Sequence, residues 1–409
     1  MISSGDTAFV LMSAALVLLM TPGLAFFYGG MVRRKNVLSV LMQCFAVACV
    51  MTVQWILFGY SVSFAPGGAF WGGLSWAGLL GVGAQPFPEY AATIPHLAFM
   101  VFQAMFAVIT PALMIGAFAE RMRFSAFLLF SILWATFVYD PVAHWVWGVG
   151  GWLRSMDALD FAGGTVVHIN AGIAAIAVAL LIGRRKSYDS RPSPPHNLPF
   201  TALGGGLLWF GWFGFNAGSA LAANAVAANA FVTTHAAAAA GGIGWVAGEW
   251  LVSRTPTLFG ALTGTVAGLV AITPAAGFVS PLAALVIGLC SGALCLVAVT
   301  VVKPRLGYDD SLDAFGVHGV GGMWGALATG LFASRAVNPA GADGLVSGNP
   351  ALLAVQALAV LATAAYSFIA TLVIYKVVDA LVGMRVDEHA EIMGLDLTQH
   401  HEAGYTVLE

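Results

Sequence analysis

The sequence has 409 residues, of which 59% are hydrophobic and 9% are charged, and its formal net charge is −3. A soluble globular domain carries charge on about a quarter of its residues, so this composition excludes that class and indicates an all-α polytopic membrane protein. The negative net charge argues against a nucleic-acid partner. The four cysteines lie in apolar segments, and we expect small buried residues with no disulfide or metal site: Cys44, Cys49, Cys290 and Cys295.

Eleven apolar segments of the sequence are each near the ~20 residues that a helix needs to cross a bilayer. No long polar stretch separates them. We therefore expect residues 1–380 to form one membrane domain, followed by a polar tail at 381–409. The predicted spans lie near 7–32, 37–64, 96–119, 124–148, 161–183, 199–221, 228–252, 257–274, 280–302, 314–333 and 350–380.

Basic residues predict the orientation of these spans. With the N-terminus outside, all 16 Lys and Arg residues except Arg154 and Arg335 fall inside, which is the usual bias in membrane proteins. The first five spans, 7–183, and the next five, 199–333, then cross in opposite directions. We therefore expect an inverted repeat of five plus five spans, joined by the basic segment 184–198, and an eleventh span that leaves the C-terminus inside.

Each predicted half ends with a histidine inside an apolar span. His168 follows Asp160 in DFAGGTVVH, and His318 follows Asp313 in DAFGVH, so both stretches contain an acid, Phe, Gly and then Val-His. Small residues beside both histidines allow helices to approach closely, and an ionisable side chain at this depth is a functional-site hypothesis. A histidine satisfied by a backbone carbonyl is the alternative. An inverted repeat would place the site near the midplane, between the halves.

Seven motifs follow one another along the chain: TPGLAFFYGG (21–30), KNVLS (35–39), AERMRF (119–124), DFAGGTVVHINAGIAA (160–175), WFGFNAGSA (212–220), ITPAAGFV (272–279) and AFGVHGVGGMWGAL (314–327). Together they resemble the Amt/Mep/Rh ammonium transporter family, and Trp147 with Ser219 indicates its Amt branch. The resemblance implies a transporter of ammonium or ammonia, not an enzyme. It also implies a multi-pass protein of the cell membrane (inner or plasma), with eleven spans, one pore per protomer and a homotrimeric assembly in lipid.

The resemblance implies an ammonium-capture site made of Trp147, Phe106, Phe215 and Ser219. An aromatic face attracts a desolvated cation by ~2 kcal/mol or more. A serine hydroxyl accepts a hydrogen bond that ammonium can donate and potassium cannot. Phe106 and Phe215 would also form a gate against hydrated ions. Phe106 is taken from FQAMF, in which Phe102 is the alternative.

The resemblance also places His168 and His318 side by side in the pore as neutral imidazoles. Each would have one hydrogen-bond donor and one acceptor. Together they could share a proton and still offer hydrogen bonds to ammonia in a dry lumen. Two other histidines are expected to be structural, because His144 lies at a membrane edge and His235 has no counterpart in the other half.

Three acidic residues and two vestibule positions complete the candidate site. Asp160 is expected to be the N-cap of the fifth span, typically worth ~1 kcal/mol, and also a buried anion that favours cations near the outer mouth. Asp310 and Asp313 occupy the related place in the second half and are expected to cap the tenth span. Phe161 and Thr273 match family positions that line the outer vestibule.

The tail sequence GLDLTQHHEAGY (394–405) resembles the cytoplasmic tail that a PII-type signal protein engages in this family. The match is partial, because the family usually shows Glu-His-Gly where Gln399, His400 and His401 stand. Two other functions stay open. One is an ammonium sensor that signals through this tail, and the other is a membrane redox protein with the two pore histidines as haem ligands. We expect no cofactor.

Overall fold

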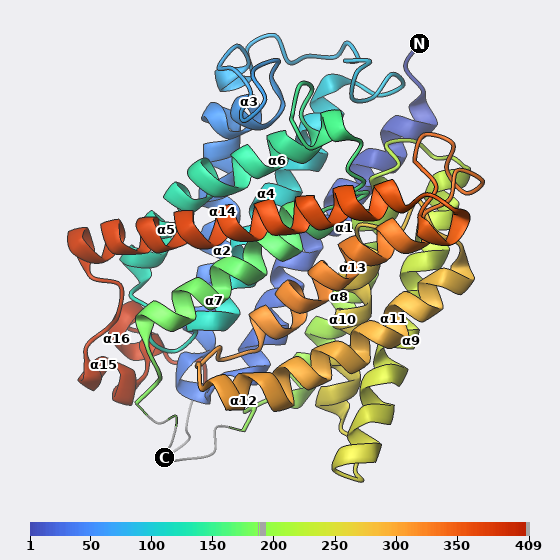
Figure 1. The fold of residues 1–409 in the computed structure, drawn as a ribbon. Helices are drawn as coiled ribbons and strands as arrows, with labels where there is room; N and C mark the ends of the chain where they lie inside the picture. The colour runs from blue at the N-terminus through green and yellow to red at the C-terminus, as the bar shows by residue number, and fades with distance from the viewer. Residues whose placement is uncertain (187, 189–193, 406–409) are drawn as a thin grey trace.

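The computed structural model describes residues 1–186, 188 and 194–405, and over these ranges the chain is helical, with β-structure limited to isolated bridges. Long helices cross the molecule side by side (Figure 1), and several contain a π-helical turn. The label η marks both these turns (η2, η4, η6, η7 and η8) and the short 3₁₀ helices (η1, η3, η5 and η9). The elements of the membrane domain are α1 (Ser4–Met31), α2 (Val37–Gln54), η2 (Trp55–Gly59), α3 (Tyr60–Phe64), α4 (His96–Phe118), α5 (Phe124–Trp134), η4 (Ala135–Tyr139), α6 (Asp140–Trp147), η6 (Gly164–Ile169), α7 (Asn170–Ile182), α8 (Leu198–Gly218), α9 (Ala225–Val252), α10 (Leu258–Ile272), α11 (Pro281–Val297), η7 (Ala298–Val302), α12 (Lys303–Leu306), η8 (Phe315–Gly319), α13 (Val320–Phe332) and α14 (Pro350–Val382).

Short elements occupy the loops and the tail. Two six-residue helices follow α14 at the end of the chain. The short elements are η1 (Arg34–Asn36), η3 (Ala77–Leu79), η5 (Arg154–Met156), η9 (Leu345–Ser347), α15 (Glu388–Met393) and α16 (Leu395–His400).

Nine helical segments in the described ranges are long and apolar enough to cross a membrane. They correspond to nine of the predicted spans. The other two predicted spans correspond to shorter helices, namely α10 with 15 residues and the continuous pair η8 and α13. The structure therefore confirms an all-helical protein with many membrane spans.

Both predicted pore histidines lie in π-helical turns, His168 in η6 and His318 in η8. A π-turn widens the helix by one residue and occurs often at functional sites. Each turn continues directly into a regular helix, α7 or α13. The two histidines therefore occupy matching positions in the two predicted halves.

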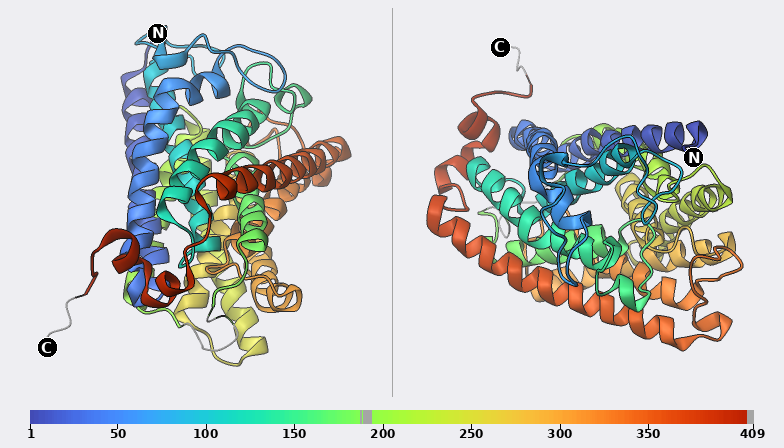
Figure 2. Two further views of the ribbon diagram at one scale, coloured as in Figure 1. Left: turned by 90° about the vertical axis from the view of Figure 1, so that its left-hand side faces the viewer. Right: turned by 90° about the horizontal axis from the view of Figure 1, so that it is seen from above.

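Helices from the two predicted halves pack closely against each other. α1 runs along α8, and glycines allow the approach, because a Cβ on Gly204 would collide with the backbone of Phe27. α14 crosses the outside of the bundle against α5, α7 and α13 (Figure 1). The start of α1 and the helices α15 and α16 lie at opposite ends of the bundle (Figure 2).

A buried charge network holds the end of the bundle nearest the tail. The side chain of Glu120 is fully buried and forms ion pairs with Arg33 at 2.9 Å and Arg185 at 3.1 Å. It also accepts a hydrogen bond from Asn36 at 3.0 Å. Arg185 pairs in turn with Asp309 at 2.9 Å. Burial alone would raise the pKa of Glu120, but the hydrogen bonds and charges of Arg33 and Arg185 outweigh it and hold this pKa below the ordinary 4.5.

The tail packs on this same end. Arg385 pairs with Glu391 at 2.8 Å and donates to the carbonyl of Ile182 at 2.9 Å. The Asp396 carboxylate accepts from the backbone N–H of Ser39 at 2.8 Å. The tail therefore contacts the start of α2, through Ser39, and the end of α7, through Ile182. Part of the predicted joint at 184–198 (187 and 189–193) and of the predicted tail at 381–409 (406–409) lies outside the described residues.

The prediction that every cysteine is buried was wrong for two of them. Cys44 and Cys295 are buried, whereas Cys49 is exposed and Cys290 half-buried on the outside of the bundle. An apolar position in a membrane helix faces either the protein core or lipid, and both environments accept a thiol. Apolar surroundings in the sequence therefore do not distinguish the two.

Candidate functional site

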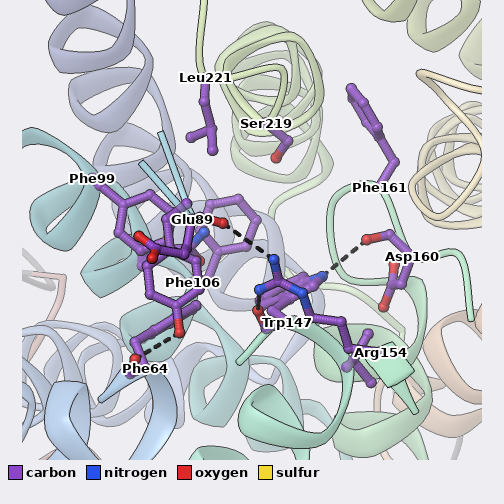
Figure 3. A pocket seen from close by; sticks show the side chains of 13 residues that line it. Phe64, Glu89, Phe99, Phe106, Trp147, Arg154, Asp160, Phe161, Ser219 and Leu221 are labelled. Atoms are coloured by element: carbon purple, nitrogen blue, oxygen red, sulfur yellow. Dashed lines mark hydrogen bonds between the residues drawn. The ribbon is translucent and has the colours of Figure 1, made fainter. Parts of the chain in front are cut away.

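A cavity of about 220 Å³ opens where α4, α6 and the end of α8 meet the loop that carries Asp160 (Figure 3). Its wall is part aromatic and part polar. Five of the residues predicted for the outer end of the site line it: Phe106, Trp147, Asp160, Phe161 and Ser219.

Hydrogen bonds fix Trp147 and Ser219 in the cavity wall. The indole Nε1 of Trp147 donates to the carbonyl of Asp160 at 2.9 Å, and Arg154 donates to the carbonyl of Trp147 at 2.5 Å. Ser219 Oγ donates its proton to the carbonyl of Phe215 at 2.9 Å. The hydroxyl therefore has only lone pairs left for a ligand, and the ring face of Trp147 is the surface that can meet a cation.

Two phenylalanines in ring contact, tilted by 41° to each other, close the inner end of this cavity. The ring centroids of Phe106 and Phe215 lie 4.4 Å apart, and each side chain is only 1% exposed. Phe102 packs edge-on behind Phe106 at 5.0 Å and is not among the lining residues in the described part of the chain. The geometry therefore favours Phe106 over Phe102 as the partner of Phe215.

A narrow apolar cavity follows on the other side of Phe215, and both histidines line it. The Nδ1 atoms of His168 and His318 lie 3.3 Å apart, and their rings are 14° from parallel. Trp212 stacks on His168 with centroids 5.5 Å apart. A third cavity continues past His318 as far as Asp313. The cavities therefore form a series from the outer aromatic wall to the other side of the histidine pair.

The histidine pair does not fit the two alternatives from the sequence. Within the described residues, Nε2 of His168 is buried with no hydrogen-bond partner, and its Nδ1 contacts His318 and not a carbonyl. A metal ion held between the two Nδ1 atoms would need them about 4 Å apart, given N–metal bonds of about 2 Å. The observed 3.3 Å leaves no room for such an ion. The arrangement therefore favours neither a carbonyl-satisfied histidine nor the haem interpretation.

Glycines bring the two histidine segments together. A Cβ on Gly172, one turn after His168, would collide with the backbone of Gly319, and a Cβ on Gly322 would lie 3.1 Å from the Cβ of His168. Only glycine leaves space for this backbone approach. The small residues predicted beside the histidines therefore set the distance between the two imidazoles.

A family model described as the Ammonium Transporter Family matches residues 8–405. This chain belongs to the ammonium transporter family. It is 56% identical over 401 residues to an ammonium transporter of Bacillus subtilis, with 98% of each chain covered. It is 49% identical over 406 residues to ammonium transporter Amt1 of Archaeoglobus fulgidus, which covers 99% of this chain and 100% of the relative.

Solved structures of the family have the same fold as this transporter. The crystal structure of Candida albicans Mep2 aligns with a TM-score of 0.89 at 37% identity, covering 95% of this chain and 87% of that one. A structure named Sensor Amt Protein aligns with a TM-score of 0.88 at 28% identity, covering 97% of this chain and 98% of that one.

Asp160 caps the first histidine segment of the transporter. Its two carboxylate oxygens accept from four consecutive backbone N–H groups, those of residues 163–166, at 2.7–3.1 Å. Asp310 caps the second segment in the same way, through the N–H groups of Ala314 at 3.0 Å and Phe315 at 2.7 Å. Both carboxylates therefore stabilise the start of a histidine-bearing helix.

Two sequence-based predictions about the transporter need correction. Asp313 does not cap the tenth span, because its carboxylate binds Lys303 Nζ at 2.6 Å. Thr273 is fully buried and, in the described ranges, is not part of the outer cavity wall. Its hydroxyl instead accepts from Trp212 Nε1 at 2.9 Å. Thr273 therefore positions the indole that stacks on His168.

The two histidines predicted to be structural, His144 and His235, lie outside the series of cavities. His144 is buried, and its ring nitrogens lie 3.0 Å from the carbonyl oxygen of Ser63 and 2.7 Å from that of Gly68. His235 is exposed on the outer face of α9 and stacks on Trp209 at 5.3 Å. His144 thus holds a loop to the bundle, whereas His235 faces the surroundings of the chain.

Sequence reasoning missed the eight other lining residues, and three of these have charged or amide side chains, namely Glu89, Gln103 and Arg154. Arg154 had a signal, because it is one of two basic residues on the predicted outer side. Gln103 had one as well, since it is a polar residue within an otherwise apolar span. Neither signal says which cavity a side chain faces, because that depends on how α4 and the loop after α6 pack.

Proposed function

We propose that this transporter captures ammonium in the outer cavity, lets it release one proton to water on the outer side, and passes the resulting ammonia between His168 and His318. The observation that carries the proposal is the histidine contact of 3.3 Å, directly behind an aromatic cavity. Moving a bare ion from water into a low-dielectric interior costs on the order of 20 kcal/mol in the idealised Born limit. A neutral molecule avoids most of that cost.

Capture depends on the groups that the outer cavity offers. The face of Trp147 attracts a cation, and the lone pairs of Ser219 accept one of its N–H groups. The Asp160 carboxylate already binds four backbone N–H groups, so it acts on the cation through space. These groups favour ammonium at the entrance, before the contacting rings of Phe106 and Phe215.

Passage depends on the narrow cavity beyond the gate. Its wall is apolar apart from the imidazoles of His168 and His318 and a few hydrogen-bonded groups. Two neutral imidazoles in contact share one hydrogen bond and keep a donor and an acceptor for ammonia. The pore can therefore bind a small neutral molecule. It offers too few polar groups to replace the hydration shell of an ion.

The assembly and topology form part of the same proposal. The chain spans the cell membrane (inner or plasma) eleven times in an inverted five-plus-five repeat, with the N-terminus outside and the C-terminus inside. The distribution of basic residues and the two shorter apolar helices support this count. We propose a homotrimer with one pore per protomer, and a PII-type signal protein as a partner at the cytoplasmic tail.

Proteoliposomes test the proposed transport. An ammonium gradient applied to vesicles that contain the purified transporter should produce a current or an internal pH change above that of empty vesicles. The absence of any such signal would contradict the proposal. A membrane-inserted variant with His168→Phe and His318→Phe, whose rings have no polar atoms, serves as a control for transport through the histidine pair.

An ammonium sensor is the second candidate, and the contacts of the tail favour it. Gln399 accepts from the backbone N–H of Phe124 at 3.3 Å, and His400 packs on the ring of Phe124 at 5.0 Å. The tail thus rests on the start of α5, next to the loop that contains Glu120. A variant that ends before residue 385 separates the two functions. Normal uptake with a lost cellular response to ammonium would support a sensor role, and an unchanged response would contradict it.

A further inference from the structure

α4 presents one polar side chain to the outer cavity. Phe99, Gln103 and Phe106 are four and three residues apart, so they share one face of this helix, and all three line the cavity. Gln103 is 91% buried, and no residue that the structure describes donates a hydrogen bond to its Oε1. A glutamine thus lies between two phenylalanines in the wall of the capture site, with its polar end unsatisfied.

An unsatisfied buried carbonyl oxygen is unfavourable, and the usual remedy is a ligand or water that donates to it. The terminal amide of glutamine has an acceptor at one end and donors at the other. Half a turn about its last bond exchanges the two ends. Gln103 can therefore present its oxygen to whatever occupies the cavity.

The other polar groups of the cavity wall leave N–H groups of a bound ammonium ion that this oxygen can accept. Tyr90 already donates to the carbonyl of Phe64 at 2.6 Å, and the Asp160 carboxylate is held by backbone N–H groups. Arg154 can only donate, and the Glu89 carboxylate, a further acceptor of the wall, belongs to a residue exposed to solvent. Ser219 offers lone pairs, so it takes one of the four N–H groups of ammonium and leaves three.

We propose that Gln103 is a further ammonium-binding residue, and that its amide oxygen accepts a hydrogen bond from the captured cation. This role rests on the proposed capture of ammonium in the outer cavity. The cation then lies between two oxygen acceptors, Ser219 and Gln103, and against the face of Trp147. The oxygen of Gln103 acts at capture, before the gate, so it affects affinity more than maximal flux.

The test compares the full-length transporter with Gln103→Met in proteoliposomes, since methionine has a similar length and no amide. We expect the half-saturating ammonium concentration to rise about tenfold, as expected from losing one hydrogen bond to a charged group, with maximal flux within about twofold. An unchanged half-saturating concentration would overturn the proposal.

A matched control is available in α2. Gln43 is also buried, and in the described ranges its Oε1 has no partner and it does not line the outer cavity. Gln43→Met should leave the half-saturating concentration unchanged. An equal rise in this variant would show a general effect of losing a buried amide and would overturn the role of Gln103.

A second substitution covers the case in which Gln103→Met fails to insert. Gln103→Glu keeps the shape and has oxygen at both ends, so the half-saturating concentration should stay the same or fall. A rise would overturn the proposal. A silent wild-type transporter would contradict the proposed function itself, whereas an active wild type with an unaltered Gln103→Met variant contradicts only the role of Gln103.

Discussion

His168 and His318, 150 residues apart in the chain, face each other with their Nδ1 atoms 3.3 Å apart. Each ring is carried by a π-helical turn, and glycines on both segments allow the backbones to touch. The contact lies in an apolar cavity behind the Phe106–Phe215 pair. Two imidazoles in such a place suit a neutral hydrogen-bonding molecule better than a hydrated ion.

Replacing both histidines should relax selectivity. A transporter with His168→Asp and His318→Asp, or with serine at both positions, has a lumen that binds water more strongly. Potassium should then produce a current in proteoliposomes that the wild type does not show. His235→Ser is the matched control, because this histidine is exposed outside the series of cavities. Unchanged selectivity in both double variants would show that the histidines do not keep the lumen dry.

Ser219→Ala should weaken capture. The change removes a hydroxyl whose lone pairs face the cavity, since its proton is donated to the carbonyl of Phe215. The half-saturating ammonium concentration should rise about tenfold, while maximal flux changes less. Ser131→Ala is a control, because Ser131 is buried elsewhere, in α5. A larger effect on maximal flux than on affinity would place the capture site somewhere else.

Asp160→Asn should destabilise the transporter. The carboxylate accepts four backbone hydrogen bonds, and asparagine would face two of these donors with an NH₂ group. We expect the free energy of unfolding to fall by about 3 kcal/mol, because at least one hydrogen bond to a charged acceptor is lost and buried donors remain unsatisfied. Thermal unfolding in detergent measures the effect. Asp157→Asn, at an exposed position, should be neutral. An equal melting temperature for both variants would contradict the capping role.

Glu120→Gln should destabilise the transporter in a pH-dependent way. The pKa of Glu120 is held below 4.5 by Arg33 and Arg185 in spite of burial, so the ionised group stabilises the fold at pH 7. That stabilisation is fully present above the unfolded-state pKa and is lost as pH falls through the lower folded-state pKa. The difference in melting temperature between wild type and variant should therefore be constant from pH 8 to about 6 and shrink below about 4.5.

A surface pair supplies the control for this experiment. Glu388 pairs with Lys186 at 3.0 Å, but both side chains are about half exposed or more. Exposed pairs contribute roughly 0–1 kcal/mol, so Glu388→Gln should leave the melting temperature almost unchanged. A difference for Glu120→Gln that stays constant down to pH 3 would show that its charge is not what stabilises the fold.

Much of this architecture follows from the sequence alone. A long apolar segment in lipid must satisfy its own backbone hydrogen bonds, and a helix does this. Hydropathy alone therefore predicted the helices. The two Val-His stretches predicted related histidine segments, the family resemblance predicted their pairing, and the acids before them predicted caps, which Asp160 and Asp310 form. These features are local, because a cap needs only a carboxylate at the right offset from its helix.

Features that depend on how helices pack could not be predicted in this way. Asp310 and Asp313 have the same chemistry, and only the position of Lys303 decides that Asp313 forms an ion pair. Thr273 lies on the side of its helix that meets Trp212, which a motif does not show. Gln103 faces the outer cavity because of the rotation of α4 about its axis, and a span that is apolar around most of its circumference does not determine that rotation.

Currents and internal pH recorded from proteoliposomes between pH 5 and 8, with ammonium or potassium as the only added cation, test most directly whether nitrogen crosses the histidine-lined pore uncharged. We predict an ammonium-dependent signal above empty vesicles and no potassium current at any of these pH values. A potassium current of similar size, or no ammonium signal, would contradict a pore that deprotonates ammonium and passes ammonia.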